Sequence, residues 1–439
     1  MLSVSSTTYK KISVLGIVWM CFLSAQAQTE NSPYSRYGLG DLLPGQNILN
    51  RSMGGVSAAY SDFHTVNFLN PASYSKLKYT TLDFGVEVDN RTLRALDPPR
   101  KFSSSSPIIS YLQLGIPLAL KKDWGMNIGL RPVTRINYKI ERNERVPGID
   151  SLNTLFEGNG GAYEVYTGTG FGIKNFSVGV NVGYLFGSKN FSTRKSFIPD
   201  SSNVFYYQSN HETQSNYNGL LLNGGVQYKI KLDKGKVNGA ELKLGAHGSL
   251  KRSLNASKDI IRETFQYNST TGAIDSLDVA SNEKDIEGKV EYPSSFGAGF
   301  LFEKPGKWMA GADLSLINWD DYRFFGETDQ VQNSWKLHVG GQVIPKPGKN
   351  YLSYVAYRLG FEYGKDYIKI DKDLPVWGFS AGASFPMRKA AYTNQYSMIN
   401  LGIEFGQRGN KDNLVRENFF RFSVGLSLSD LWFVKRKYD

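Results

Sequence analysis

The chain has 439 residues, a formal net charge of +11 at pH 7 and one cysteine, Cys21. Glycine (45 residues) and aromatic residues (13%) are frequent, yet the mean hydropathy is only −0.35. Basic residues are scattered among acidic ones and form a single block at 435–437. This distribution argues against a nucleic-acid-binding surface and favours attraction to anionic lipid headgroups.

The first residues have the three-part pattern of a secretory signal peptide. Lys10 and Lys11 precede twelve apolar residues, and residues 25–27 read Ala-Gln-Ala. Twelve apolar residues are too few to cross a bilayer as a helix, so a short membrane anchor is the weaker interpretation. We expect residues 1–27 to be cleaved off. Because Cys21 leaves with them, disulfides, thiolate metal sites and cysteine nucleophiles are excluded from the mature chain.

The next stretch is polar and rich in small residues, and it precedes the first strand pattern. Between Arg51 and Leu77 it reads RSMGGVSAAYSDFHTVNFLNPASYSKL, in which Asn-Pro-Ala marks a turn. We predict that residues 28–78 form a plug, or hatch, inside a barrel that residues 79–439 build. The motif residues are Gly54, Gly55, Ala58, Ala59, Asp62, Asn70, Pro71 and Ala72.

Throughout the rest of the chain, apolar and polar residues alternate with a period of two. Trp335, Leu337 and Val339, for example, alternate with Lys336 and His338. Such alternation is typical of strands with one buried and one hydrated face. It predicts fourteen strands, over residues 79–90, 108–120, 123–142, 161–173, 175–199, 214–232, 238–267, 286–303, 307–326, 333–345, 354–371, 376–386, 396–408 and 418–434.

The connections between these strands largely alternate between short and long. Short polar turns follow the second, fourth, eighth and tenth strands. Outer-membrane barrels have short periplasmic turns and long outer loops, whereas a soluble β-sandwich has no reason to gather its long loops at one end. Longer, polar loops are expected at 91–107, 143–160, 200–213, 268–285, 327–332 and 409–417.

Closure of the sheet follows from the cost of exposing backbone groups to lipid. Each unpaired N–H or C=O group in hydrocarbon costs roughly several kcal/mol, so only a closed ladder is tolerable. The sequence therefore predicts an all-β fold: a fourteen-stranded antiparallel transmembrane β-barrel in the outer membrane, with an N-terminal luminal hatch. Fourteen strands leave a lumen that side chains alone do not fill.

The small-residue motif resembles a known family. The run Met53-Gly54-Gly55, with Ala58-Ala59, Asp62 and Asn70-Pro71-Ala72, resembles the hatch of FadL-type outer-membrane transporters of long-chain fatty acids and other hydrophobic compounds. The resemblance implies a hatch-plugged barrel of fourteen strands. Two features depart from the family: residues 32–41 are polar and aromatic, and the chain ends in 432–439 instead of an aromatic strand residue.

If the resemblance extends to function, a hydrophobic molecule enters an apolar pocket against the hatch and moves on when the hatch shifts or through a gap in the wall. Gly54 and Gly55 would then supply hinge freedom and Pro71 a fixed corner, although the same residues suit a backbone that is merely fitted into a crowded lumen. The candidate luminal polar residues either bind a ligand carboxylate or pair with one another and with hatch groups, because buried charges need partners. They are Lys336, His338, Glu404 and Arg421.

A second function belongs to a different class. Some relatives of the FadL family are thought to serve as carriers or subunits of type IX secretion machinery, which implies a non-transporting accessory barrel that docks secretion or assembly proteins through its long loops. A continuous apolar pocket touching residues 54–72 would favour transport. A lumen packed with charged side chains would favour the accessory barrel.

Enzymatic interpretations find little support in the sequence. None of the four histidines lies at metal-ligand spacing on a helix, and no nucleophile motif is recognisable. His64, in the predicted hatch, is a candidate for titration near neutral pH or for a local hydrogen bond. No catalytic residue, metal or cofactor is therefore assigned. The expected partners are the bilayer with its lipopolysaccharide, a hydrophobic small molecule and secretion or assembly proteins, but not nucleic acid.

Overall fold

The computed structural model describes residues 32–96, 99–148, 150–198, 206–233, 239–268, 270, 272, 274–388 and 396–432. The predicted signal peptide and the end of the predicted last strand lie outside this range. Within it, no helix combines the length and the apolar character that crossing a membrane would require.

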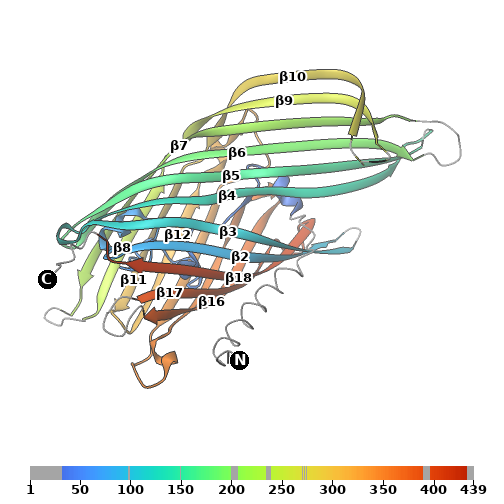
Figure 1. Ribbon diagram of the computed structural model, residues 1–439. Helices are drawn as coiled ribbons and strands as arrows, with labels where there is room; N and C mark the ends of the chain where they lie inside the picture. Colours follow the sequence, from blue (N-terminus) through green and yellow to red (C-terminus); the bar gives the residue numbers. More distant parts are fainter. Residues whose placement is uncertain are drawn as a thin grey trace, which may run out of the picture.

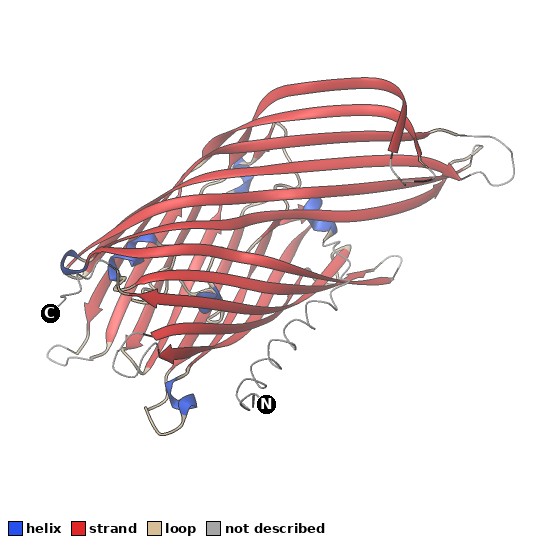
Figure 2. Ribbon diagram, in the orientation of Figure 1, coloured by secondary structure: helices blue, strands red, loops and turns tan. Residues whose placement is uncertain are grey.

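Strands make up most of the molecule, and its helices are short (Figures 1 and 2). The helices are η1 (Pro33–Arg36), α2 (Ile48–Arg51), η2 (Pro71–Lys76), η3 (Leu120–Lys122), η4 (Trp319–Asp321) and η5 (Tyr351–Tyr354). The strands are β1 (Asp41–Leu42), β2 (Thr80–Ala95), β3 (Arg100–Ala119), β4 (Trp124–Arg145), β5 (Ser151–Ile173), β6 (Phe176–Ile198), β7 (Gln208–Lys231), β8 (Glu241–Ser249), β9 (Arg252–Tyr267), β10 (Ile274–Tyr292), β11 (Ser295–Lys304), β12 (Trp308–Ile317), β13 (Arg323–Phe324), β14 (Ser334–Val343), β15 (Ala356–Ile370), β16 (Lys372–Arg388), β17 (Tyr396–Arg408) and β18 (Val415–Asp430).

The strands close into an antiparallel ring. β18 pairs with β2 along its whole length, which joins the last strand to the first. β8 and β9 pair with successive parts of β7 and together fill one place in the ring, as β10 and β11 do beside them. β1 and β13 are two-residue strands attached to β4 and β10. The ring therefore has fourteen places, which confirms the predicted barrel.

Each wall strand presents one face outward and one to the lumen. In β6 the side chains of Val178, Val180 and Val182 point outward and are 42–45% exposed, whereas Ser177 and Asn181 on the other face are buried. An outward apolar face around a polar interior is the arrangement of a transmembrane barrel. The alternation of apolar and polar residues predicted from the sequence thus corresponds to the outward and luminal faces of the wall strands.

The two ends of the barrel differ. β2 begins and β18 ends at one end, which we call the turn end, and the opposite end is the far end. At the far end β4, β5, β6, β7, β9 and β10 continue well past the other strands and form a projecting sheet (Figure 1). We call this part of the six strands the far-end sheet.

The far-end sheet corrects several predicted loops. Residues 143–160 and 268–285 are mostly strand, because β4 runs to Arg145, β5 begins at Ser151 and β10 begins at Ile274. The regular apolar alternation that marks a strand is missing there, because polar residues predominate and apolar neighbours such as Leu155 and Phe156 fall on opposite faces. In addition, β3, β7 and β18 begin before the predicted strand starts, inside the expected loops 91–107, 200–213 and 409–417.

The predicted strand 307–326 is also wrong in its second half. β12 ends at Ile317, and the following residues turn into the lumen, where Trp319 and Tyr322 are 1% and 0% exposed. They join an apolar cluster with Tyr34, Leu39 and other side chains from the wall. This cluster packs the beginning of the predicted hatch against the wall.

The wall divides towards the far end. Among the described residues, β3 and β4 pair only along Leu112–Ala119 and Trp124–Leu130. Beyond that, β3 pairs with β2, and β4 pairs with β5 and, at Thr134 and Arg135, with β1. The far-end sheet therefore has one free edge along β4 and a second along β10, where Val290 and Glu291 alone pair with β13.

Residues 32–79 cross the lumen, and we call them the luminal segment. η2 contacts β3 to β7, whereas α2 contacts β16 to β18 on the other side of the ring. Ser32 bonds Glu417 near the far end, and Lys76 reaches Asp123 in the turn after β3. The segment thus runs from the far end to the turn end.

Candidate functional site

Small residues of the luminal segment meet glycines of the wall. A Cβ atom on Gly360 would lie 1.9 Å from the backbone nitrogen of Gly54, and one on Gly340 would lie 2.1 Å from the carbonyl oxygen of Met53. A Cβ on Gly245 would lie 2.0 Å from the carbonyl oxygen of Ala58. Such distances exclude any side chain, so the two backbones touch directly.

Gly54 and Gly55 adopt conformations that other residues rarely take. Their φ angles are +68° and +94°. Gly54 donates its N–H to Ser380 Oγ at 2.8 Å, and its carbonyl oxygen accepts from His338 Nδ1 at 2.6 Å. Both glycines are therefore held by the wall, which favours the fitted-backbone interpretation over a hinge.

The Asn-Pro-Ala turn is anchored by one amide side chain. Asn70 Nδ2 donates to the carbonyl oxygens of Ala58 (2.6 Å) and Val226 (3.2 Å), and its Oδ1 accepts from Ala72 N at 3.1 Å. Pro71 starts η2, and the backbone there passes close to wall glycines. Asn70 thus joins the turn, the Ala58 region and the wall.

Replacing Asn70 by alanine is expected to destabilise this junction. The change leaves the buried N–H of Ala72 without its partner, whereas the carbonyl of Ala58 still accepts from Gln227, and an unsatisfied buried polar group costs about 1–3 kcal/mol. Amide hydrogen exchange of residues 57–76 in detergent should become at least tenfold faster. Asn413→Ala, which removes an amide from the far-end turn before β18, should leave that exchange unchanged. Equal exchange in Asn70→Ala and the wild type would contradict this role.

A second anchor lies opposite the turn. Asp313 of β12 accepts from the backbone N–H groups of Ser57 (2.5 Å) and Ala58 (2.7 Å) through one carboxylate oxygen. Asp62, the remaining polar residue of the motif, accepts from the N–H of His64 at 2.7 Å. The motif residues thus meet the wall at several places around the ring, with Gly54 at β15, Ala58 at β8 and Asn70 at β7.

Buried ion pairs fix α2 to the wall. Arg51 is 4% exposed and binds Glu87, and its Nε donates to Glu404 at 2.7 Å. Glu404 also binds Arg421 (3.2 Å), which lies 3.4 Å from Asp89. Two of the candidate luminal residues, Glu404 and Arg421, therefore lie in a chain of pairs that ends on the luminal segment.

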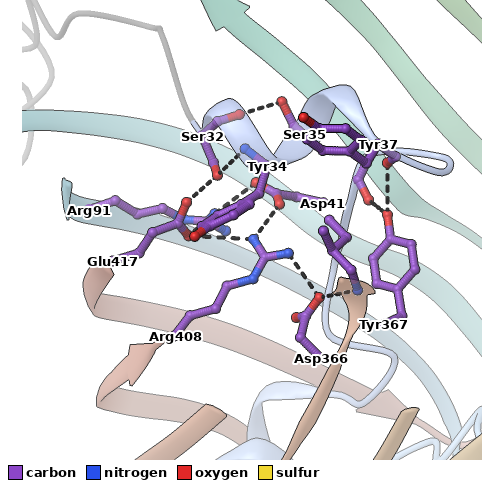
Figure 3. Close-up of polar contacts among 12 residues, drawn as sticks. Ser32, Tyr34, Ser35, Tyr37, Asp41, Arg91, Asp366, Tyr367, Arg408 and Glu417 are labelled. Atoms are coloured by element: carbon purple, nitrogen blue, oxygen red, sulfur yellow. Dashed lines mark hydrogen bonds and ion pairs between the residues drawn. The ribbon is translucent and has the colours of Figure 1, made fainter. Parts of the chain in front are cut away.

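A second ionic cluster surrounds Asp41, which is 2% exposed (Figure 3). Arg91 and Arg408 each bind one of its carboxylate oxygens, at 2.8 and 2.7 Å. Arg408 also binds Asp366 at 3.0 Å and Glu417 at 3.4 Å. Strands from distant parts of the sequence, which are neighbours in the ring, thus converge on one residue of the luminal segment.

Side chains near the far end also bind the segment at Gly38. Its N–H donates to Asp329 Oδ2 at 2.8 Å, and its carbonyl oxygen accepts from Lys189 (2.9 Å) and Tyr322 (3.2 Å). Nearby, burial and then the negative charge of Glu417 raise the pKa of Tyr34 to about 12. The beginning of the segment is therefore as firmly held as its middle.

His338, Lys336 and His64 complete the set named from the sequence. His338 is 4% exposed and lies 3.8 Å from Glu362 through Nδ1, in addition to its bond to Gly54. Lys336 is half-buried on the same strand. His64 is buried and stacks on Tyr79 with ring centroids 4.6 Å apart. Burial lowers the pKa of His64, and the charge of Asp62 opposes that shift.

A cavity of about 330 Å³ remains beside the luminal segment. Leu42, Leu43 and Phe68 line part of it, but many of its walls are charged or polar. Those lining residues include Arg51, Arg91, Arg131, Lys336, Glu362, Glu404, Arg408 and Arg421. The cavity therefore differs from a continuous apolar pocket. Within the described ranges, no cluster of three or more His, Cys, Asp or Glu side chains is arranged to hold a metal ion.

Sequence reasoning missed several residues of this site. Asp41, Arg408, Glu417 and Asp313 occupy luminal positions of strands or of the polar stretch before the motif. Their only sequence signal is a charged residue at an inward position of an alternating strand. That signal gives no partner, because each partner comes from a distant part of the chain.

The family assignment comes from a comparison with family models. The model described as BamG matches residues 8–439 of this sequence. The chain belongs to the BamG family. None of the curated proteins matches it.

Solved structures of FadL-type channels have a fold similar to that of this BamG-family barrel. The P. putida toluene transporter TodX is 16% identical, with a TM-score of 0.58 over 90% of this chain and 100% of that one. A Pseudomonas aeruginosa FadL homologue is 13% identical (TM-score 0.57, 89% and 98%), and the Ralstonia pickettii toluene transporter TbuX is 12% identical (0.54, 88% and 99%). At these identities the likeness establishes the fold alone. It confirms the FadL-type barrel predicted from the sequence.

Proposed function

We propose that this BamG-family protein is an accessory barrel of the outer membrane that docks another protein through its far-end sheet. The observation that carries the proposal is the combination of a luminal segment held by buried ion pairs with a sheet that projects past the rest of the ring. The turn end would face the periplasm and the far end the outside, as in barrels with short periplasmic turns.

The buried ion pairs of the luminal segment support a role other than passage. Moving the luminal segment aside would separate Arg51 from Glu87 and Asp41 from Arg91 and Arg408. Separating one buried pair costs about 3–5 kcal/mol. A cost of about 5.5 kcal/mol already limits an open state to roughly one molecule in 10⁴. Spontaneous opening would therefore be rare.

The free edge of β10 supports docking and indicates the partner's charge. Along residues 274–288 this strand pairs with β9 alone among the described residues, so its other edge offers unpaired backbone groups up to Lys289, whose carbonyl oxygen accepts from the N–H of Phe325. Its side chains there are mostly exposed, and carboxylates outnumber lysines. The carboxylates are Asp275, Asp278, Glu283, Asp285 and Glu287, and the lysines are Lys284 and Lys289. A partner with a basic surface would be electrostatically complementary.

Site-specific crosslinking in native outer membranes tests the proposal. A photo-crosslinking residue at Val279 or Asn282 should give one discrete protein adduct, and the triple change Asp275→Lys, Asp278→Lys and Glu283→Lys should reduce its yield at least tenfold. Crosslinks formed only with lipid at Val279 and Asn282 would contradict docking at this edge.

The control variant carries the same kind of change on the other free edge. Glu141→Lys and Glu144→Lys alter two exposed carboxylates of β4, and the adduct at β10 should persist in that variant. Loss of the adduct in both variants would show an effect of net charge instead of a docking edge.

Uptake of a hydrophobic small molecule is the second candidate, and the 330 Å³ cavity beside the luminal segment favours it. Similar solved structures are named as toluene transporters and a FadL homologue. Liposomes containing the purified barrel distinguish the two functions. Uptake of toluene or palmitate above that of empty liposomes would support transport, and its absence would support the accessory barrel.

A further inference from the structure

The outward face of the barrel changes character at the base of the far-end sheet. Tyr163, Phe186 and Leu220 end the uninterrupted rows of large apolar side chains on the outward faces of β5, β6 and β7, and they are 40–62% exposed. Beyond them the outward positions of these strands are occupied mainly by amides, serines and charged residues. This change marks the outer limit of the band that contacts hydrocarbon.

Four amide side chains lie in one row directly above that limit. Asn137 of β4 pairs with Asn159 of β5, Asn159 with Asn190 of β6, and Asn190 with Gln214 of β7. Neighbouring strands are about 4.8 Å apart, so the row is about 14 Å long. Asn190 Nδ2 donates to Asn159 Oδ1 at 3.2 Å, and all four side chains are exposed or half-buried.

A polar hollow adjoins the row. It has a volume of about 300 Å³ and is lined by the first three amides together with Lys139, Glu157, Arg194 and Glu212. Glu157 binds Arg194 at 2.8 Å and Lys139 at 3.4 Å. Two cations and two carboxylates therefore line the hollow, which is polar without an excess of either charge.

We propose that this row and hollow bind the sugar headgroup of a glycolipid in the outer leaflet. A carboxamide offers two donors and an acceptor, which matches the paired hydroxyl groups of a sugar. The position of the row indicates that the sugar belongs to a membrane glycolipid. The row lies where the lipid-contacting face of the barrel continues into the headgroup layer. This inference rests on the proposed outer-membrane location but not on partner docking.

A polar surface that is simply hydrated would not need this arrangement. Hydration requires no fixed register of amides over four strands, and it requires no hollow beside them. A sugar-binding face requires both the register and the hollow. Its hydrogen-bonding groups must be presented together, because water competes for each of them at the surface.

Native mass spectrometry of the purified full chain in nanodiscs tests the proposal. The probes are lipopolysaccharide that carries core sugars, lipid A without core sugars, and phosphatidylethanolamine. The wild type should retain the core-sugar form preferentially. The variant Asn159→Ala, Asn190→Ala, Gln214→Ala should bind it at least tenfold more weakly.

A matched control removes amides elsewhere on the same sheet. Gln266→Ala and Asn282→Ala alter exposed amides of β9 and β10 outside the row, and they should leave binding unchanged. Binding by the triple variant that equals the wild type, or lipid A bound as tightly as the core-sugar form, would overturn the proposal.

A competition measurement keeps the proposal testable if the triple variant does not fold, as judged by its heat-dependent gel mobility. Free core oligosaccharide should displace the core-sugar lipopolysaccharide from the wild type. Failure to displace it would overturn the proposal. Because the purified protein is used alone, the absence of a docking partner does not affect either measurement.

Discussion

Arg51→Ala is expected to destabilise the luminal segment by about 3–5 kcal/mol, because it leaves Glu87 buried without its cation. Glu404 is less affected, since Arg421 still binds it. The exchange of amide hydrogens in residues 48–58 should accelerate by at least a hundredfold while the wall strands stay protected. Hydrogen exchange with mass spectrometry in detergent measures both regions in one experiment.

Lys76→Ala is the matched control for this change. It also removes a cation that the luminal segment pairs with the wall, but Lys76 and Asp123 are 30% and 47% exposed in their side chains. Exposed pairs contribute about 1 kcal/mol or less. Exchange in residues 48–58 should therefore stay close to that of the wild type. If both variants behave alike, the buried pair does not hold the segment.

Gly360→Ala is expected to displace the luminal segment from the wall. The added Cβ would lie 1.9 Å from the backbone nitrogen of Gly54, and backbone on both sides leaves nothing flexible to move away. Overpacking in a well-packed interior costs typically about 1–3 kcal/mol, and this contact lies at or above the upper end. A cysteine-labelling reagent should reach Ser57→Cys much faster in the Gly360→Ala background.

Gly224→Ala serves as its control. Gly224 is also a strand glycine of the wall, but a Cβ there would have nothing within 4 Å. Labelling of Ser57→Cys should then be as slow as in the wild-type background. Rapid labelling in both backgrounds would mean that strand glycines act through general flexibility and not through contact with Gly54.

The sequence predicted the wall well because lipid imposes a period of two. In β6, apolar residues recur at every second position from Val178 to Phe186, and the predicted strand 175–199 nearly matches the observed one. The same rule fails above the lipid, where β10 begins at Ile274 and its two faces are both polar. The strand there is set by pairing with β9, and pairing leaves no periodic mark on one sequence.

The residue types of the site could be predicted from the sequence, but the contacts between its residues could not. The motif from Gly54 to Ala72 is visible because its residues are unusually small, and the structure supplies the reason in Gly340, Gly360 and Gly245 of the wall. The ionic anchors were not predictable, since Asp41 finds partners hundreds of positions away. Ion pairs between such distant residues can form only when the strands have closed into the ring.

The path of the luminal segment constrains the order of assembly. It is attached to β2 at the turn end, passes the narrow glycine contacts, and finishes beneath Trp319 and Tyr322 at the far end. A finished ring would leave no passage for threading a chain through those contacts. The ring must therefore close around a segment that is already in place. Residues 32–79, which are synthesised before the wall strands, thereby serve as a template for the closure of the barrel.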